Sequence, residues 1–293
     1  MQIVRYEEPS TRAPRPGLRV GERLVEIPRL SSLAELWALG PDELRALVEE
    51  AAAEGSSVHG GARLLAPVDG RTEVWACGVT YEISRQARVE ESERSADVYE
   101  RVYEAERPEL FFKSVPWKVV GDRGSIAIRE DSTLDVPEPE LAVVVGAGGQ
   151  LLGYTICDDV SSRSIEGENP LYLPQAKTYL GACALGPGVT PAWEVADPYS
   201  LRIELHIERG GALAWSGAAT TALLHRRLEE LVAFLRRADV FPDGAVLSTG
   251  TCLVPPAPWS LEDGDTVRIQ IEGLGMLTTK VVRGVDGARA AMR

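Results

Sequence analysis

The sequence predicts an α+β fold in two parts, a small N-terminal α/β domain over residues 1–66 and a β-rich body over residues 67–293. Two observations predict this class. Short apolar runs of strand length are separated by glycine and proline, whereas few segments carry helical periodicity. The pattern also changes near residue 64, just after the glycine- and serine-rich stretch 55–61. Many strands with few helices are typical of a β-rich α+β body.

The N-terminal domain is expected to contain two strands and one helix. The strand candidates are Met1–Tyr6 and Leu18–Ile27. A helix is expected over Pro41–Ala53, because Pro-Asp-Glu makes a favourable first turn and Gly55 follows the last helical residue.

The body is expected to hold two helices and a series of short strands. The longest helix candidate is Tyr81–Glu106, and the second is Thr220–Arg237, which has leucines at helical spacing. The strand candidates are Trp117–Val120, Ser125–Ile128, Leu141–Val145, Leu151–Cys157, Leu201–Ile207, Ala245–Ser248 and Thr266–Glu272.

Composition excludes several classes of function. A net charge of -13 argues against nucleic acid or an anionic membrane as a partner. The sequence has neither a signal-peptide pattern nor an apolar run of membrane-spanning length. The four cysteines are too far apart for a zinc site or a disulfide framework, which fits a reducing cytoplasm. An anionic substrate would need a local cation in so acidic a protein.

Three carboxylates give the strongest local signal. Glu138 and Glu140 are two residues apart at the start of an apolar run, so both side chains point to one face of a strand. The glycines at 146–149 allow the chain to turn back as a hairpin, which brings Asp159 beside the glutamates. An all-oxygen set suits Mg²⁺, Mn²⁺ or Ca²⁺ and leaves positions open for substrate. The alternative is that these acids are solvated or protect a sheet edge.

Lysine is rare in this sequence. Four of the 31 basic residues are lysines, and they are Lys113, Lys118, Lys177 and Lys280. Lysine differs from arginine in being compact and able to lose its proton, so each of the four is a candidate for a functional role.

Several motifs, in order, resemble the fumarylacetoacetate hydrolase superfamily across residues 64–280. They are Pro108-Glu-Leu-Phe-Phe-Lys113, Glu138-Pro-Glu140, Gly153-Tyr-Thr-Ile-Cys-Asp-Asp-Val-Ser-Ser-Arg163, Gln175-Ala-Lys177, Leu185-Gly-Pro187 and Ser248-Thr-Gly-Thr251. The resemblance implies a mixed β-sandwich roll and a homo-oligomer, a dimer or a tetramer. It also implies Mg²⁺ or Mn²⁺ bound by Glu138, Glu140 and Asp159.

One departure from the family pattern narrows the expected chemistry. The family's hydrolases and decarboxylases carry a water-activating His–Glu pair after a Gly-x-x-Tyr segment, but here those positions are Ser84 and Ala87. A serine without a base does not deprotonate water near neutral pH. The stretch 164–177 resembles instead the branch that dehydrates 2-keto-3-deoxy sugar acids. The implied reaction converts 2-keto-3-deoxy-D-arabinonate, foremost, into 2,5-dioxopentanoate and water.

This chemistry needs a metal, a base and an acid. The metal would polarise the C2 carbonyl and stabilise the enolate that forms when C3 loses its proton. Lys177 is expected to contact the substrate and relay the C3 proton, and Glu109 is expected to act as acid or base at the C4 hydroxyl. Lys113 and Arg163 are expected to pair with acidic residues near the metal. The remaining expected substrate contacts are Ser84, Arg85, Thr249, Gly250 and Thr251.

Three alternatives stay open at this stage. The same metal could serve an acylpyruvate hydrolase or an oxaloacetate decarboxylase. The chain could also be a non-catalytic metal-binding subunit. The oxygen ligands do not distinguish Mg²⁺ from Mn²⁺.

Overall fold

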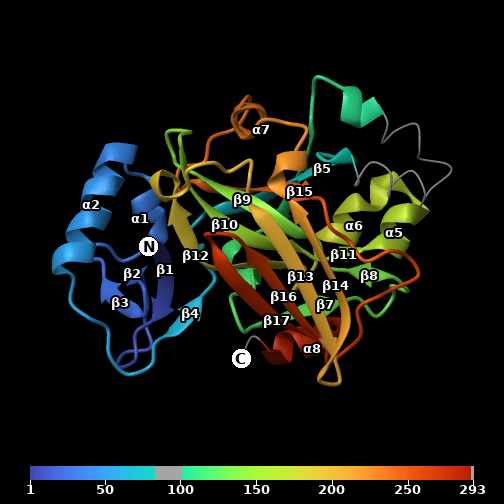
Figure 1. The fold of residues 1–293 in the computed structure, drawn as a ribbon, viewed down its shortest axis with the longest axis horizontal. Coiled ribbons are helices and arrows are strands. Elements are labelled where there is room, and N and C mark those ends of the chain that lie inside the picture. Colours follow the sequence, from blue (N-terminus) through green and yellow to red (C-terminus); the bar gives the residue numbers. More distant parts are fainter. Residues whose placement is uncertain (83–100, 292–293) are drawn as a thin grey trace.

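The computed structural model describes residues 1–82 and 101–291, and it confirms the α+β class (Figure 1). The strands of the described residues are β1 (Gln2–Glu7), β2 (Pro14–Val20), β3 (Arg23–Glu26), β4 (Arg63–Leu65), β5 (Glu73–Gly78), β6 (Glu109–Ser114), β7 (Ser125–Ile128), β8 (Asp135–Val136), β9 (Pro139–Val145), β10 (Leu151–Asp159), β11 (Ser161–Ser162), β12 (Cys183–Pro191), β13 (Arg202–Arg209), β14 (Ala212–Thr220), β15 (Ala245–Thr251), β16 (Thr266–Ile271) and β17 (Gly275–Arg283).

The helices of the described residues are short. The α-helices are α1 (Leu33–Trp37), α2 (Pro41–Glu54), α5 (Arg163–Glu168), α6 (Leu173–Lys177), α7 (Leu228–Leu235) and α8 (Gly284–Ala291). The 3₁₀ helices are η1 (Pro116–Lys118), η2 (Pro170–Tyr172), η3 (Ala192–Glu194) and η4 (Thr221–Leu223). No helix within these residues is long and apolar enough to cross a membrane.

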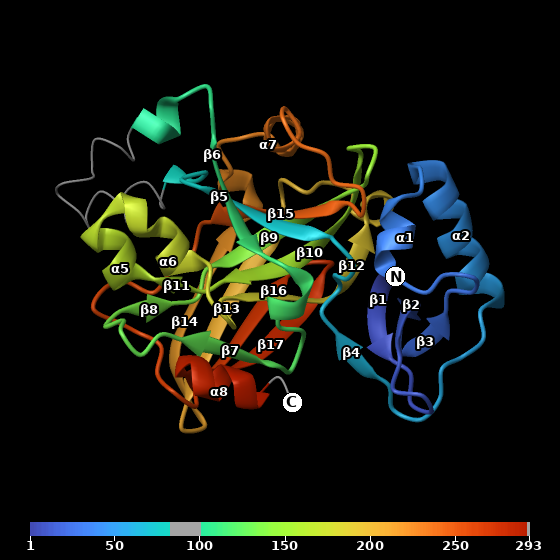
Figure 2. The same cartoon turned by 180° about the vertical axis from the view of Figure 1, so that it is seen from behind.

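These strands form three sheets. The ten-stranded sheet has the order β3-β2-β1-β12-β10-β9-β15-β5-β6, with β4 paired to β1. The five-stranded sheet has the order β14-β13-β16-β17-β7, and β8 pairs with β11 in a two-stranded ribbon. The long strands β13, β14, β16 and β17 cross one face of the larger sheet, which gives the expected sandwich (Figures 1 and 2).

Strand β9 lies at the centre of the fold because it is apolar on both faces, and all seven of its residues are buried. Val143 packs between the two large sheets in a core with Leu205 of β13 and Ile269 of β16. Its neighbour Val144 faces the other side, in a second core with Val48 of α2. The strand that carries Glu140 is therefore fixed by packing on both sides.

The N-terminal strands continue the main sheet. β1 pairs antiparallel with β12, with Ile3 opposite Val189. The predicted helix is confirmed as α2. The predicted single strand over Leu18–Ile27 is wrong, because the chain turns at residues 21–22 and the stretch forms the end of β2 and the whole of β3 in a hairpin. The boundary after residue 66 stays a prediction, although strands from both sides of it share one sheet.

The predicted hairpin that brings the three carboxylates together is confirmed. β9 and β10 pair antiparallel, with Cys157 opposite Glu140 and Asp158 opposite Pro139. The amide of Asp159 donates to the carbonyl of Glu138 at 3.0 Å, which closes the end of the hairpin. The strand alternation of β9 and β10 thereby places all three carboxylates at one end of the sheet.

Three further predicted elements, all in the body, differ from the structure or fall outside it. The predicted helix Thr220–Arg237 begins only at Leu228, because Leu224 bridges to Tyr81 and the amide of His225 donates to the carbonyl of Thr80. The predicted strand Trp117–Val120 is wrong for its first half, because Trp117 and Lys118 belong to the 3₁₀ helix η1, which begins at Pro116 with its fixed φ; Val120 forms a single β-bridge with Ala184. The predicted helix Tyr81–Glu106 lies mostly outside the described residues.

Candidate active site

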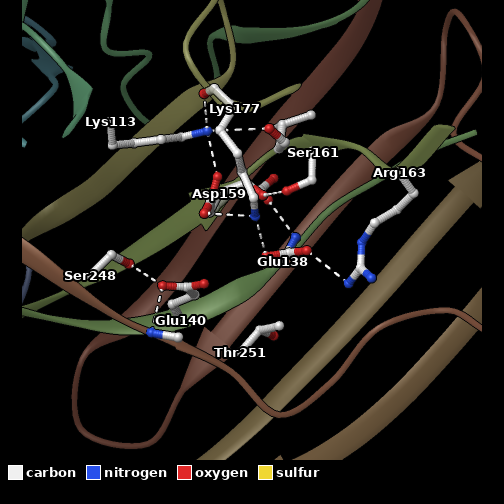
Figure 3. Close-up of polar contacts among 12 residues, drawn as sticks. Lys113, Glu138, Glu140, Asp159, Ser161, Arg163, Lys177, Ser248 and Thr251 are labelled. Carbon is white, nitrogen blue, oxygen red and sulfur yellow. Dashed lines mark hydrogen bonds and ion pairs between the residues drawn. The ribbon is translucent and has the colours of Figure 1, made fainter. Parts of the chain in front are cut away.

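The three carboxylates converge in the interior of the protein (Figure 3). Each of Glu138, Glu140 and Asp159 offers an oxygen within 4.8 Å of the other two. Their exposed fractions are 2%, 1% and 1%, so bulk water does not screen their mutual repulsion. A cluster of this kind is stable only with positive charge among its members.

Three buried cations supply that charge. Lys177 Nζ lies 2.7 Å from Glu138 Oε2 and 3.0 Å from Asp159 Oδ2. Lys113 forms an ion pair with Asp159, and Arg163 lies 2.8 Å from Glu138 Oε1. The expectation that Lys113 and Arg163 pair with acids near the site is confirmed. Three carboxylates and three cations make a cluster of zero net formal charge.

Glu140 is the carboxylate of the three that forms no ion pair with these cations. Its Oε2 accepts hydrogen bonds from the hydroxyl of Ser248 at 2.5 Å and from the amide of Gly250 at 2.8 Å (Figure 3). Burial, followed by the charges of Asp159 and Glu138, raises the pKa of Glu140 well above its usual range. Oε1 accepts no hydrogen bond from the described residues. That oxygen is free to coordinate a cation.

Asp158 has a structural role. Its Oδ1 accepts a hydrogen bond from the amide of Glu138 at 3.1 Å, which holds the residue before β9 in place. Burial raises the pKa of Asp158 to about 8, so this carboxyl is mostly protonated at neutral pH. It therefore adds little negative charge to the neighbouring cluster.

A small cavity of about 20 Å³ opens beside the carboxylates, lined by Cys77, Gly78, Val79, Glu109, Phe111, Glu138, Glu140, Glu166, Leu173, Lys177 and Thr251. A cavity of this size holds about one water molecule or one ion. The five-carbon sugar acid expected from the sequence motifs is larger than this cavity. Lys177 is the only amine among the described residues that line it.

Gly78 makes room for the carboxylate of Glu109. The two residues lie opposite each other in the β5–β6 pair, and a Cβ atom at position 78 would lie 1.9 Å from Glu109 Oε2. The next residue, Val79, has a φ of 52°, which is strained for a β-branched side chain. The close approach at Gly78 and the strained backbone of Val79 thus allow Glu109 to lie beside the cavity.

The three residues expected from the Ser-Thr-Gly-Thr motif have different positions. Thr251 lines the cavity, and the amide of Gly250 orients Glu140. The hydroxyl of Thr249 instead donates to the carbonyl of Leu141 at 2.8 Å, inside the sheet. Ser84 and Arg85, expected to contact substrate, lie outside the described residues, as does Ala87.

Glu166 was not among the sequence candidates. Helix α5 begins at Arg163 with its N-cap Ser162, and Glu166 is buried at 4% exposure while lining the cavity. The available signal was its spacing: residues i and i+3 share one face of a helix, so Arg163 at the cluster brings Glu166 toward it.

The residues present fit a divalent metal ion. Mg²⁺ and Mn²⁺ prefer oxygen ligands, and Glu138, Glu140 and Asp159 provide oxygen atoms only, on rigid elements of the sheet. The unengaged oxygen of Glu140 and the raised pKa of that residue both indicate that the cluster accommodates further positive charge.

The fold and this site define a metal-dependent enzyme with a β-sandwich body. The family model for the fumarylacetoacetate (FAA) hydrolase C-terminal domain matches residues 74–282. The chain belongs to this family.

Three relatives illustrate the similarity. A probable 2-keto-3-deoxyxylonate dehydratase of Haloferax volcanii is 45% identical over 86% of this chain and 86% of its own length. A 2-dehydro-3-deoxy-D-arabinonate dehydratase of Saccharolobus solfataricus is 46% identical over 75% of this chain and 74% of its own length. A solved structure of 2-keto-3-deoxy-D-arabinonate dehydratase complexed with magnesium and 2,5-dioxopentanoate has a TM-score of 0.82 and 35% identity, and the match covers 97% of this chain and 99% of that one.

Proposed function

We propose that this protein is a Mg²⁺-dependent hydro-lyase that converts a 2-keto-3-deoxypentonate into 2,5-dioxopentanoate and water. The observation that carries the proposal is the buried cluster of Glu138, Glu140 and Asp159, with Lys177 held against two of the three carboxylates. It is supported by two dehydratase relatives at 45% and 46% identity and by a relative structure that contains magnesium and the product.

The names of the two relatives describe one substrate in the D series. Dehydration and tautomerisation to the 2-keto-3-deoxy acid remove the stereocentres at C2 and C3. D-Xylonate and D-arabinonate have the same configuration at C4, which is the only stereocentre left. The proposed substrate is therefore 2-keto-3-deoxy-D-arabinonate, which is identical to the D-xylonate derivative.

The charges of the site suit an anionic keto acid. The six groups of the cluster have zero net formal charge, so a divalent ion brings an excess of two positive charges. Glu138, Glu140 and Asp159 would hold that ion. When bound, such an ion would supply Lewis-acid catalysis to an anionic keto acid. The negative charge of the substrate carboxylate and the negative charge that develops at the C2 oxygen offset these two excess positive charges.

Lys177 is the proposed base at C3, acting as the neutral amine. The charge of a divalent ion held by Glu138 and Asp159 would favour this neutral form by lowering the pKa of the ammonium. Lys177 comes from the end of α6, is 2% exposed, and is fixed by its two carboxylate partners and by a contact with the Phe111 ring at 5.7 Å. Lys113 Nζ donates to the carbonyl of Lys177 at 2.5 Å, which positions the backbone of the same residue. Proton transfer by a group so positioned contributes about 10² to 10⁴ in rate.

Two carboxylates are assigned to the other end of the substrate. Loss of the C3 proton and the C4 hydroxyl leaves an alcohol at C5. Moving one proton from C5 to C3 then gives an enol, and the enol becomes the aldehyde when its hydroxyl proton is lost and C4 gains a proton. We assign protonation of the leaving hydroxyl to Glu109, which is partly exposed and can pass the water to solvent. We assign the C5 proton to the buried Glu166, which lines the same cavity.

We further propose that the protein is a cytoplasmic homo-oligomer, a dimer or a tetramer. The four cysteines are free and buried, which suits a reducing compartment. Light scattering of the purified protein measures the oligomeric state.

The test of the proposed function is turnover of 2-keto-3-deoxy-D-arabinonate with Mg²⁺ and with EDTA. A coupled NAD⁺-dependent aldehyde dehydrogenase detects 2,5-dioxopentanoate. Turnover with Mg²⁺ that stops with EDTA and returns on adding Mg²⁺ is the expected result. Absence of product from a protein that binds Mg²⁺ would contradict the proposal and direct the assay to acylpyruvates and oxaloacetate.

A further inference from the structure

A second and much larger cavity lies between the N-terminal strands and the body. It has a volume of about 730 Å³. Its walls come from β4 on one side and from η1, β7 and α8 on the other, and Figure 2 shows β4 opposite β7 and α8. None of its lining residues lines the cavity at the carboxylate cluster. Its volume is in the usual range for small-molecule sites, which often lie between structural units.

The lining of this cavity is basic. It includes five cations and one carboxylate, Asp122, although the whole chain carries a net charge of -13. The cavity is called the basic cleft after these five side chains, which are Arg5, Arg19, Arg63, Lys118 and Arg123. Cations gathered in a concave, partly desolvated space produce a local positive potential even in an acidic protein.

The acids near the basic cleft also bind groups outside it. Glu7 binds Arg63 at 2.7 Å but also Arg12 at 2.8 Å. Asp69 accepts hydrogen bonds from two backbone amides at the start of α1, both at 2.9 Å, and lies 3.6 Å from Arg5 Nε. These acids therefore compensate the cleft only in part.

Three of the cations have unused capacity to bind an anion. Arg5 Nε is buried and has no hydrogen-bond partner among the described residues. Arg19 donates to the neutral amide of Gln2, and Lys118 lies 5.2 Å from the centre of the Trp117 ring. Neither Arg19 nor Lys118 forms an ion pair with a carboxylate in the part of the chain that the structure describes. The Nε–H of Arg5 is buried without a hydrogen-bond acceptor in the described part of the chain, although Asp69 lies 3.6 Å away, so a ligand that supplies an acceptor is favoured.

We propose that the basic cleft binds a small polyanion that carries several phosphate or carboxylate oxygens. Guanidinium groups match the planar, paired oxygens of both ligand types, and the ammonium of Lys118 adds a point charge. The volume admits a small molecule, and the strongly acidic surface elsewhere repels nucleic acid. The site is separate from the dehydratase chemistry and does not depend on it.

Isothermal titration calorimetry of the full-length, Mg²⁺-loaded protein tests the proposal with two probes, inorganic phosphate and tricarballylate. Sodium chloride at equal ionic strength controls for screening. We expect saturable, one-to-one binding of at least one probe, and the stronger probe identifies the ligand class. Lys118→Glu is expected to weaken that binding about tenfold or more, because a cation is replaced by a repelling charge.

Arg23→Glu is the matched control, since Arg23 is exposed on β3 and does not line the cleft. It makes the same change in net charge in the same region, so it should leave the affinity within about twofold of the parent. Keto-acid turnover by Lys118→Glu, unchanged in the absence of probe, shows that the variant is folded.

Three results would overturn the proposal. The first is no saturable binding of either probe at millimolar concentration. The second is an equal loss in Lys118→Glu and Arg23→Glu, which indicates nonspecific attraction. The third is a change in oligomeric state caused by Lys118→Glu, because a second copy of the chain would then cover the cleft in the parent.

Discussion

The carboxylate cluster balances its charges internally, whereas the basic cleft has an excess of positive charge. In the cluster, three buried acids meet three buried cations at short distance, in a space of about 20 Å³. In the basic cleft, five cations line a cavity of about 730 Å³, and the nearby acids also bind groups outside the cleft. The net charge of the whole chain therefore does not reveal which ligand a site favours. The local balance does: the neutral cluster gains two positive charges with a divalent ion, and the cleft lacks negative charge.

The largest expected effect comes from removing the ammonium at the cluster. Lys177→Met should lower kcat by about 10² to 10⁴, because the C3 proton loses its acceptor. The same change should tighten Mg²⁺ binding, since the ammonium no longer competes for Glu138 and Asp159. Steady-state kinetics and metal titration measure the two effects. Full turnover would remove Lys177 from the mechanism.

Loss of one negative charge at the cluster is expected to act mainly on the metal. Glu140→Gln should weaken Mg²⁺ binding by more than about 10²-fold, the upper end of losses seen for residues that only support a ligand. The amide oxygen can still accept from Ser248 and Gly250, so the fold should be retained. Calorimetric titration of Mg²⁺ is the measurement, with Glu54→Gln on the exposed face of α2 as control. Unchanged affinity would show that the metal lies elsewhere.

A smaller effect on kcat is expected from filling the space that Gly78 leaves beside Glu109. Gly78→Ala places a methyl group where a Cβ would lie 1.9 Å from Glu109 Oε2, so the carboxylate must move. Misplacement by about 1 Å can cost about 10²-fold in rate, and we expect a loss of this order in kcat with little change in Mg²⁺ affinity. Gly40→Ala is the control, because nothing lies within 4 Å of a Cβ there. Equal kcat in the two variants would argue against Glu109 as the acid.

Glu109 and Glu166 can be separated from each other by their products. Glu109→Gln should lower the rate of water loss, so little intermediate forms. Glu166→Gln should allow water loss but slow aldehyde formation, and the conjugated 5-hydroxy-2-oxo-pent-3-enoate should accumulate. Absorbance of the conjugated ketone, followed with the coupled aldehyde assay, distinguishes them. Each substitution should lower aldehyde production by about 10² or more. Identical kinetics with no accumulation would contradict this division of roles.

The smallest expected effect concerns a buried acid without a cation. Asp135 forms no ion pair with the described residues, and burial raises its pKa from 3.8 to about 6. The folded state therefore holds this proton more tightly than the unfolded chain. At pH 7 both states are ionised, and the buried charge costs about 1 to 2 kcal/mol after allowance for screening. This cost disappears as the pH falls from about 6 to about 4.

Asp135→Asn should remove that pH dependence. The difference in free energy of unfolding between variant and parent should change by about 1 to 2 kcal/mol between pH 7 and pH 4.5. Urea denaturation at both pH values measures it. A constant difference across this range would show that Asp135 has an ordinary pKa.

The local geometry of the site follows from residues that are close together in the sequence. Strand alternation places Glu138 and Glu140 on one side, and the glycines at 146–149 permit the turn that returns the chain to Asp159. Proline at the first helical position and Gly55 at the end likewise predicted α2 to within one residue. These features depend on neighbours in the chain, so they are readable from it.

Contacts between groups far apart in the sequence could not be predicted and became visible only in the folded protein. The helix at residues 228–235 is shorter than its leucine pattern predicted, because backbone hydrogen bonds to the segment near Thr80 hold the residues before it. Strand β12, with its glycines and prolines, was not predicted, yet it pairs with both β1 and β10. The contact between Gly78 and Glu109, the cations at the cluster and the basic cleft all join segments far apart in sequence. Local propensity carries no information on such contacts, because packing and pairing between distant strands determine them.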